Sequence, residues 1–275
     1  MALIAGPTAS GKSGLALALA KLLPVTIINA DASQVYRDLR IVSARPSVEE
    51  EAQAPHKLFG TWDGGVACSA AEWASEAKTE IEAAHAEGRL PALVGGTGLY
   101  IRTLLDGIAP VPPIDPDVRA TVRAMASREA YQLLTTEDPE AAARLSPNDS
   151  SRVARALEVV RSTGRPIKAW HSERVGGIGE NVTLCPMILL PPREWLRQRC
   201  DARFDTMLKT GGIAEVESLL ARNLDPALPV MRAIGVREIA ARIANPSAAE
   251  KYGAEAKIAT RQYAKRQYTW FRNQL

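Results

Sequence analysis

The chain has 275 residues, a formal net charge of +3, 46% hydrophobic residues and three cysteines. This length suffices for one α/β domain with an inserted or appended piece. The cysteines and histidines are scattered without a Cys-x-x-Cys pair, no apolar run reaches the length of a membrane span, and the N-terminus has no signal-peptide pattern. These features disfavour a metal cage and a membrane protein, and we expect a reduced, cytoplasmic protein.

The charge is distributed unevenly along the chain. Residues 1–110 hold 9 basic and 12 acidic side chains, whereas residues 111–275 hold 25 and 19. Residues 251–275 alone have six basic residues and one acid. A basic C-terminal segment indicates either a polyanionic partner such as nucleic acid or a solvated charged helix.

The first 110 residues predict alternating strands and helices. Apolar or β-branched runs predict buried strands at residues 2–5, 25–31 and 90–94. Ser69 and Glu72 form a capping-box pattern for a helix that ends near residue 87. Further helices are expected at residues 15–23 and from the glycine-rich turn at 95–98 to about residue 105. Residues 40–68 look irregular. This alternation is typical of a parallel sheet with helices on both faces.

The remainder of the chain is mainly helical. Between residues 116 and 176 only helical patterns occur, at residues 117–126, 127–134, 139–145 and 149–162. A strand-like run at 183–190 returns to the sheet, and helices follow at residues 192–208, 213–222, 231–243 and 248–271, the last with a second capping box, Ser247 and Glu250. We predict an α/β fold of the P-loop NTPase type with a parallel sheet, formed by residues 1–112 and 177–275. Residues 113–176 would form an inserted all-helical subdomain, and the C-terminus is helical.

A phosphate-binding loop lies between the first strand and the first helix. Residues 6–13 read GPTASGKS and match the G-x-x-x-x-G-K-[ST] pattern of nucleotide-binding (ATP-binding) P-loop proteins, in the strand–loop–helix context that it requires. Such a loop wraps backbone N–H groups around phosphate oxygens. The predicted diphosphate ligands are Gly6, Pro7, Thr8, Ala9, Ser10, Gly11, Lys12 and Ser13, with the Ser13 hydroxyl as the Mg²⁺ ligand.

Two further strand ends place polar side chains beside this loop. In a doubly wound sheet ligands bind at the carboxyl ends of the strands, and there the chain has Asp31 and Thr97. Asp31 could act as a general base, ligate Mg²⁺ or cap a helix. The strand at 90–94 ends in Gly-Gly-Thr-Gly rather than in the acid that usually helps to hold Mg²⁺ in phosphate-loop NTPases, which weakens a kinase interpretation.

Basic residues recur on two predicted helices. The helix at 192–208 begins after the returning strand, and its Arg193, Arg197, Arg199 and Arg203 could clamp a diphosphate or form surface ion pairs. On the last helix, Lys257, Arg261 and Lys265 follow one another at i+4 steps, with Arg266 on the neighbouring stripe. Such a face is suited to tracking a phosphate backbone.

Taken together, these motifs resemble the tRNA dimethylallyltransferase family. The matching segments are GPTASGKS at 6–13, DASQVY at 31–36, VGGTGLY at 94–100, RVARALEV at 152–159, GRP at 164–166 and ATRQYAKRQYTWF at 259–271. They span nearly the whole chain in the expected order, and the last is the most specific.

The resemblance implies an enzyme that transfers a dimethylallyl group from dimethylallyl diphosphate to N6 of adenosine 37, in the anticodon loop of tRNAs that read codons starting with U. It implies Asp31 as the base, Thr97 beside the reacting centre, and Mg²⁺ as cofactor. Arg193 and Arg199 are the expected diphosphate-binding arginines. We expect a monomer whose partners are the tRNA anticodon stem-loop and the prenyl diphosphate.

The residues expected to contact tRNA come from several segments. They are Asp31, Ala32, Ser33, Gln34, Thr97, Arg119, Ser151, Arg152, Arg155, Arg232, Gly235, Arg237, Arg261, Lys265 and Arg266. The chain departs from the family pattern at Ala32, Ser151 and Val236, positions that bear on RNA contacts more than on chemistry. An ATP-dependent small-molecule kinase and a non-catalytic RNA-binding P-loop protein are the alternatives.

Overall fold

The computed structural model describes residues 1–274 of the chain, and these divide into two compact units. The first contains residues 1–105 together with residues 179 onward, and the second is Asp106–Ile178. The predicted insert, 113–176, lies within the second unit. None of the helices in the described part of the chain combines the length and apolar character that crossing a membrane requires.

A five-stranded sheet forms the centre of the first unit. Its strands are β1 (Ala2–Ala5), β2 (Val25–Asn29), β3 (His56–Lys57), β4 (Leu90–Gly95) and β5 (Cys185–Ile188). All neighbours are parallel, in the order β3-β2-β4-β1-β5. The fold class expected from the sequence is therefore confirmed, and the loops after β2, β4 and β1 lie side by side at one edge of the sheet.

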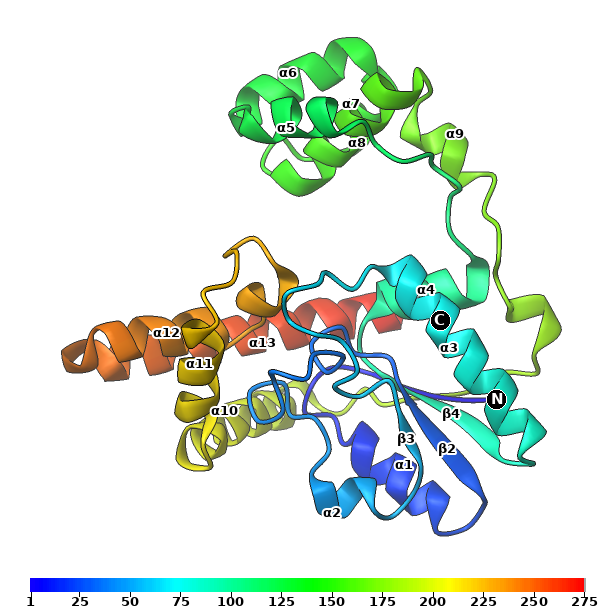
Figure 1. Ribbon diagram of the computed structural model, residues 1–275, viewed down its shortest axis with the longest axis vertical. Helices are drawn as coiled ribbons and strands as arrows, with labels where there is room; N and C mark the ends of the chain where they lie inside the picture. Colours follow the sequence, from blue (N-terminus) through cyan, green and yellow to red (C-terminus); the bar gives the residue numbers. More distant parts are fainter. Residues whose placement is uncertain (275) are drawn as a thin grey trace. The chain divides into compact units, whose positions relative to one another are not determined.

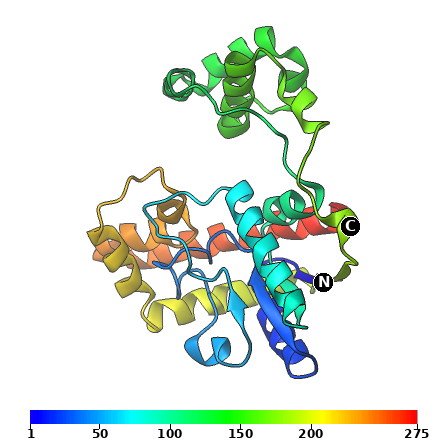
Figure 2. The same cartoon turned by 45° about the vertical axis from the view of Figure 1, so that its right-hand side comes forward.

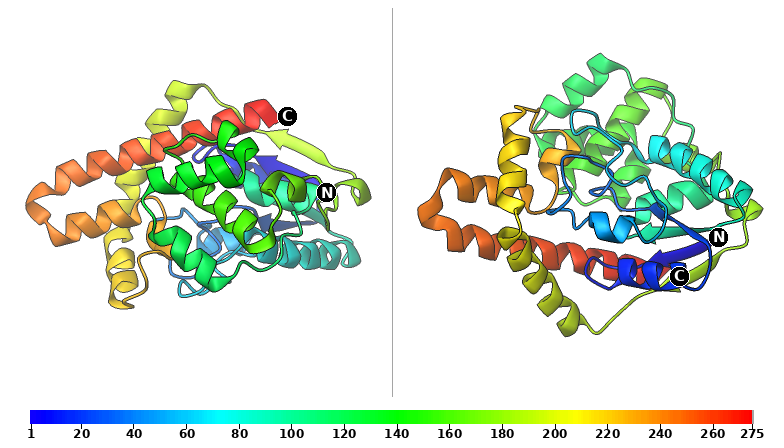
Figure 3. Two further views of the ribbon diagram at one scale, coloured as in Figure 1. Left: turned by 90° about the horizontal axis from the view of Figure 1, so that it is seen from above. Right: turned by 60° about the horizontal axis from the view of Figure 1, so that its bottom comes forward.

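Helices cover both faces of this sheet. The helices of its N-terminal half are α1 (Lys12–Ala20), α2 (Val48–Glu51), α3 (Ala70–Ala86) and α4 (Gly98–Asp106). Because the crossover from β1 to β2 and the crossover from β3 to β4 run in opposite directions along the sheet, α1 and α3 pack on opposite faces (Figure 1, Figure 3). Beneath α1 the core contains Ile4, Val25, Ile27 and Val94. The capping box of Ser69 and Glu72 forms at the start of α3, as predicted.

The C-terminal part of the first unit is helical. It comprises η1 (Gly179–Asn181), α10 (Arg193–Lys209), α11 (Gly212–Ala221), η2 (Pro229–Arg232), α12 (Val236–Ala244), η3 (Pro246–Ala248) and α13 (Ala249–Gln274). The single helix predicted at 231–243 is wrong, because Gly235 takes a left-handed φ of 96° and separates η2 from α12. Ser247 lies in η3, where its hydroxyl bonds Asn245 instead of capping α13. Figure 2 shows α13 as the long orange-to-red helix.

The second unit is a small helical bundle. Its helices are α5 (Pro116–Ala124), α6 (Ser127–Glu137), α7 (Pro139–Arg144), α8 (Ser150–Thr163) and α9 (Ile167–His171). The apolar sides of α5 to α8 meet in a core that contains Val122, Leu134, Val153 and Leu157. This unit thus has a hydrophobic centre of its own.

Candidate active site

The phosphate loop between β1 and α1 is held in a shape that requires glycine at both ends. An added Cβ at Gly6 would lie 2.4 Å from the Leu189 carbonyl oxygen, and Gly11 caps α1 with a φ of 98°. The Lys12 ammonium donates to the Pro7 carbonyl oxygen at 2.8 Å, across the loop. The Ser10 hydroxyl is buried without a protein partner. The loop therefore presents a compact, donor-rich surface at the start of a helix.

Lys12 lies in an unusual electrostatic setting. Burial lowers the pKa of its ammonium from 10.5 to about 8; Asp31 opposes this decrease, and Arg203 adds to it. Lowering the pKa of a lysine by desolvation means that its charge lacks compensation in the free protein. An anion bound at the loop would supply that compensation.

Two arginines of α10 reach the loop. The Arg203 guanidinium hydrogen-bonds the Thr8 hydroxyl, and Arg199 Nε donates to the Ala9 carbonyl oxygen at 3.2 Å. Burial lowers the pKa of Arg203. Arg193, which the sequence favoured, instead lies over the Tyr268 ring at 5.2 Å and lines a groove between α10 and α13. The sequence placed Arg203 among the arginines that could clamp a diphosphate but favoured Arg193 and Arg199 as the ligands; the structure brings Arg203 to the loop together with Arg199.

Asp31 is fixed by a buried asparagine at the end of β2. Asn29 is 0% exposed; its Oδ1 accepts from the Asp31 N–H at 2.8 Å, and its Nδ2 donates to the carbonyl oxygens of Asp31 and Leu58 at 3.0 Å each. The Ser33 N–H donates to Asp31 Oδ1 at 2.9 Å. The carboxylate is consequently oriented by local backbone and keeps acceptor capacity for a substrate proton.

Thr97 lies beside Asp31 at the end of the neighbouring strand. Its hydroxyl accepts from the Ala32 N–H at 2.9 Å, its own N–H donates to the Ala30 carbonyl oxygen at 3.1 Å, and its side chain shares a hydrogen bond with Tyr263 of α13. An added Cβ at Gly95 would lie 2.2 Å from the Ala30 carbonyl oxygen. The two strand ends are therefore packed in direct contact.

Two cavities meet at Asp31. The larger, about 600 Å³, is lined by Lys12, Ser13 and Arg199 and by the apolar Ile27 and Phe59. The smaller, about 50 Å³, opens among Ser33, Val42, Phe204 and Tyr263. Asp31, Thr8 and Arg203 line both cavities. A carboxylate is thus located between a cationic cavity and a second opening.

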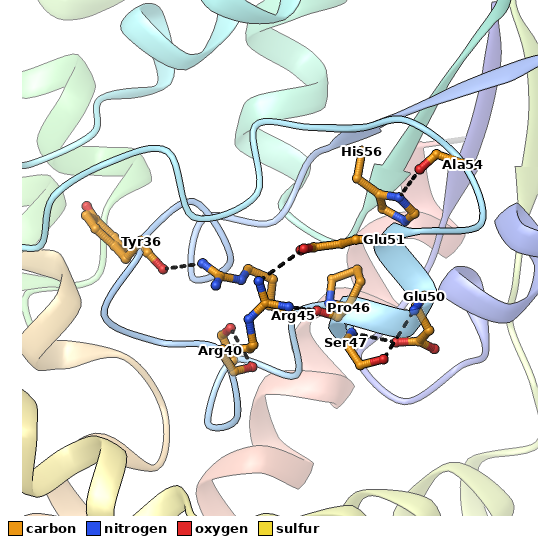
Figure 4. Close-up of polar contacts among 10 residues, drawn as sticks. Tyr36, Arg40, Arg45, Pro46, Ser47, Glu50, Glu51, Ala54 and His56 are labelled. Atoms are coloured by element: carbon orange, nitrogen blue, oxygen red, sulfur yellow. Dashed lines mark hydrogen bonds and ion pairs between the residues drawn. The ribbon is translucent and has the colours of Figure 1, made fainter.

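The segment of residues 40–57, which looked irregular in the sequence, contains α2 and β3, and its residues Ala44, Pro46, Glu50 and His56 line the larger cavity (Figure 4). Arg40 pairs with Glu51 at 3.1 Å and donates to the Pro46 carbonyl oxygen at 2.6 Å. Glu215 of α11 accepts the N–H groups of residues 40, 41 and 42 at 2.6, 2.8 and 2.8 Å. Although its sequence looks irregular, this segment is fixed by long-range bonds.

The predicted RNA contacts of the first unit fall into three groups: side chains bonded to protein groups, exposed cations, and covered positions. Arg261 pairs with Asp201 of α10 at 2.6 Å, and Gln34 donates to the carbonyl oxygens of Ser43 and Ala44 at 3.0 Å each. Lys257, on the same stripe, pairs with Asp205 at 2.7 Å. The exposed members, by contrast, are Arg232, Arg237, Lys265 and Arg266. The remaining positions are Ala32 and Ser33, both half-buried near Asp31, and Gly235, buried at the start of α12.

The second unit carries the other predicted RNA contacts. Ser151 and Arg152 are exposed on α8, and Arg152 pairs with Asp149 at 3.2 Å. The buried Glu158 carboxylate accepts from Arg123 at 2.7 Å and forms a longer ion pair with Arg155, at 3.9 Å. Burial lowers the pKa of Arg155, and the positive charge of Arg119 adds to this decrease. This unit therefore offers a cationic group built around one buried acid.

Magnesium would find oxygen ligands at the phosphate loop. Ser13 is exposed in the first turn of α1 and lines the larger cavity together with Asp31. Hydroxyl, carboxylate and phosphate oxygens are the donors that Mg²⁺ prefers, and it is usually bound through one or two protein groups plus substrate phosphates. The residues present fit that pattern.

Comparisons with known proteins agree with this geometry. The profile of the family described as "IPP transferase" matches residues 34–274. The chain is similar to the tRNA dimethylallyltransferase of Sphingopyxis alaskensis, with 62% identity over 275 residues, 100% of this chain and 90% of that protein. Among solved structures, it is similar to the full-length tRNA isopentenylpyrophosphate transferase of Bacillus halodurans, with 33% identity and a TM-score of 0.69 over 99% of this chain and 86% of that one. A eukaryotic dimethylallyltransferase described as acting on tRNA matches with 28% identity and a TM-score of 0.83, over 98% and 69%.

Proposed function

The chain belongs to the IPP transferase family, and we propose that it transfers a dimethylallyl group from dimethylallyl diphosphate to N6 of adenosine 37 in the anticodon loop of tRNAs that read codons starting with U. The observation that carries this proposal is the position of Asp31 between the cationic cavity and the second opening. A prenyl donor held on one side and an RNA base entering from the other would meet at this carboxylate.

The diphosphate would bind at the phosphate loop. Residues Ala9, Gly11, Lys12 and Ser13 of the loop and Arg199 and Arg203 of α10 line the larger cavity, and their backbone N–H and cationic groups would bind the phosphate oxygens. As the bond between C1 and the diphosphate oxygen breaks, negative charge grows on the leaving group, and fixed cations stabilise it. Mg²⁺ held by Ser13 would add further charge neutralisation when bound.

The adenine N6 is a weak nucleophile because its lone pair is delocalised into the ring. As N6 forms its bond to C1, the Asp31 carboxylate would accept the N6 proton and later release it to solvent. The Thr97 hydroxyl would orient the base through a hydrogen bond. The base must leave the anticodon-loop stack to reach this depth, as it does in other base-modifying enzymes.

The RNA would be held by cations of both units. In the first unit, Lys265 and Arg266 are exposed on α13. In the second, Arg152 and Arg155 lie on α8, and Arg119 lies on α5 close enough to affect the pKa of Arg155. Contacts of this kind to phosphates fix the position of the anticodon stem-loop. The expected monomeric state and cytoplasmic location also stay predictions.

One labelling experiment tests the proposal against its alternatives. The protein is incubated with unmodified tRNA and either radiolabelled dimethylallyl diphosphate or γ-labelled ATP. Label from the prenyl donor should enter tRNA and be recovered as N6-isopentenyladenosine after digestion. Steady release of phosphate from ATP, stimulated by a small metabolite, would favour a kinase, and binding of tRNA without incorporation of label would favour a non-catalytic RNA-binding protein.

A further inference from the structure

A glutamine in the C-terminal helix joins two loops of the candidate active site. Gln267 of α13 is only 5% exposed. Its Oε1 accepts from the Thr8 N–H at 2.8 Å, and its Nε2 donates to the Gly96 carbonyl oxygen at 2.8 Å. The partners lie 259 and 171 residues away in the sequence. One side chain therefore spans the phosphate loop and the loop that carries Thr97.

The loop backbone at Gly96 and Gly98 lies very close to side chains of α13. A Cβ added at Gly96 would lie 2.2 Å from Gln267 Nε2 and 3.0 Å from the Gly6 carbonyl oxygen. A Cβ added at Gly98 would lie 2.5 Å from the Trp270 ring. The glycines of this loop thus allow α13 to approach the backbone closely, and the amide occupies the space that a side chain at position 96 would need.

The same face of α13 reaches the reacting centre one turn earlier. Tyr263, four residues before Gln267, shares a hydrogen bond with Thr97 and lines the smaller cavity beside Asp31. Gln267 itself is not among the residues that line either cavity. Any effect of Gln267 on the reaction must therefore pass through the two loops that it bonds.

We propose that Gln267 is a positioning residue, which sets the distance between the diphosphate site and the Thr97–Asp31 pair. By accepting the Thr8 N–H, the amide fixes the entry of the phosphate loop, so that the N–H groups of the following residues face the phosphate. By donating to the Gly96 carbonyl, it fixes the residue immediately before Thr97. A displacement as small as 1 Å between donor and acceptor can reduce a rate about 100-fold. This inference rests on the proposed function.

The decisive variant is Gln267→Glu, because its chemistry changes with pH. An ionised glutamate can still accept from Thr8 but places a negative oxygen against the Gly96 carbonyl. A protonated glutamic acid has nearly the shape of glutamine and can again donate to that carbonyl. Burial and the facing carbonyl raise the pKa of such an acid, so protonation should occur within the range of the assay. Both natural partners are backbone groups, so the wild-type contact does not titrate.

The experiment measures kcat for tRNA prenylation at saturating substrates between pH 6 and 8, for wild type, Gln267→Glu, Gln267→Met and Gln53→Glu. Gln53 is exposed on the surface, lines neither cavity, and provides the same chemical change without a buried partner. At pH 8, Gln267→Glu and Gln267→Met should lose about ten- to hundredfold in kcat, the factor expected from unsatisfied buried groups, while KM for tRNA stays unchanged. The kcat of Gln267→Glu divided by the wild-type kcat should rise several-fold as the pH falls. The same quotient for Gln267→Met should stay constant.

The outcomes separate this inference from the proposed function. Formation of product by the wild type tests the function, and only the ratios test Gln267. A Gln267→Glu ratio that is independent of pH, or a Gln267→Met variant with the wild-type kcat, would overturn the inference. If either variant does not fold, as judged by circular dichroism, the shorter Gln267→Asn replaces it; it can reach at most one partner, and a wild-type kcat in that variant would equally refute the role.

Discussion

The lowered pKa of Lys12 leads to a prediction about how the protein binds its prenyl donor. In the free protein, burial brings the pKa of this ammonium to about 8, so that much of it is neutral at pH 8 and most of it at pH 9. A bound diphosphate returns the pKa toward 10.5. Binding should therefore take up a proton above pH 8, and affinity should be full below pH 8 and decrease as the pH rises toward 10.

The size of the effect follows from the shift in pKa. A full return from about 8 to 10.5 corresponds to roughly 3 kcal/mol, or on the order of a hundredfold in affinity. The ligand does not contribute, because phosphate monoesters complete their last ionisation near pH 6. Burial raises the pKa of the nearby Cys200 thiol and of the Tyr263 phenol above their ordinary values, which works against titration of either group near pH 8. Lys12 is thus the group expected to titrate.

The assay is calorimetric titration of dimethylallyl diphosphate, without tRNA, between pH 7 and 10 at constant ionic strength and Mg²⁺. Repeating it in buffers of different ionisation enthalpy counts the protons taken up. Lys12→Arg, whose side chain stays charged throughout, should bind with an affinity nearly independent of pH, and Lys12→Ala should bind weakly at every pH. A wild-type affinity that is constant from pH 7.5 to 9.5 would show that Lys12 is fully charged in the free loop and would refute the reasoning.

Three further outcomes are expected. Asp31→Ala should lower kcat about 10²- to 10⁴-fold with little change in tRNA affinity, as measured by single-turnover kinetics and filter binding; near-normal turnover would remove Asp31 from the mechanism. Asn29→Leu removes the partners of the Asp31 N–H and the Leu58 carbonyl, while the Asp31 carbonyl keeps the Gln34 N–H; it should reduce the free energy of unfolding in urea by about 2–5 kcal/mol, and a loss below about 1 kcal/mol would contradict the bonding described here. The double variant Lys265→Ala, Arg266→Ala should flatten the salt dependence of tRNA binding by about 0.7–0.9 per lost phosphate contact; an unchanged slope would assign the RNA contacts to the second unit.

The fold was accessible from the sequence where local signals were strong. The phosphate loop, the strand–helix alternation and the capping box of Ser69 each depend on residues within one turn or one strand. The failures occur where distant contacts decide. Residues 40–57 look irregular, but Glu215 bonds three of their N–H groups from α11. The break between η2 and α12 depends on the backbone conformation at Gly235 in that packed setting.

The residues of the candidate site likewise divide into those that local signals and topology identified and those that depend on distant contacts. Asp31 and Thr97 were identified because parallel topology brings strand ends together, whatever the details of packing. Asn29 and Gln267 were not selected, since each acquires its role from a partner that no sequence pattern specifies. Arg193 and Arg199 were favoured as diphosphate ligands, yet in the structure Arg193 lies over the Tyr268 ring, and Arg203, four residues after Arg199, is the second arginine that reaches the loop.

The C-terminal helix shows why periodicity predicts a face but not its function. Steps of four residues placed Lys257, Arg261 and Lys265 on one stripe, and the sequence indicated that the whole stripe could face RNA. Asp205 and Asp201 of α10 neutralise the first two, so that this part of the stripe docks the helix onto the protein. Lys265 and Arg266 stay exposed, while Gln267, next in the chain, points inward to the phosphate loop. Neighbouring residues of one helix therefore serve RNA binding and loop geometry separately. A variant at Lys265 should change the salt dependence of tRNA binding without changing kcat, and a variant at Gln267 should change kcat without changing the salt dependence.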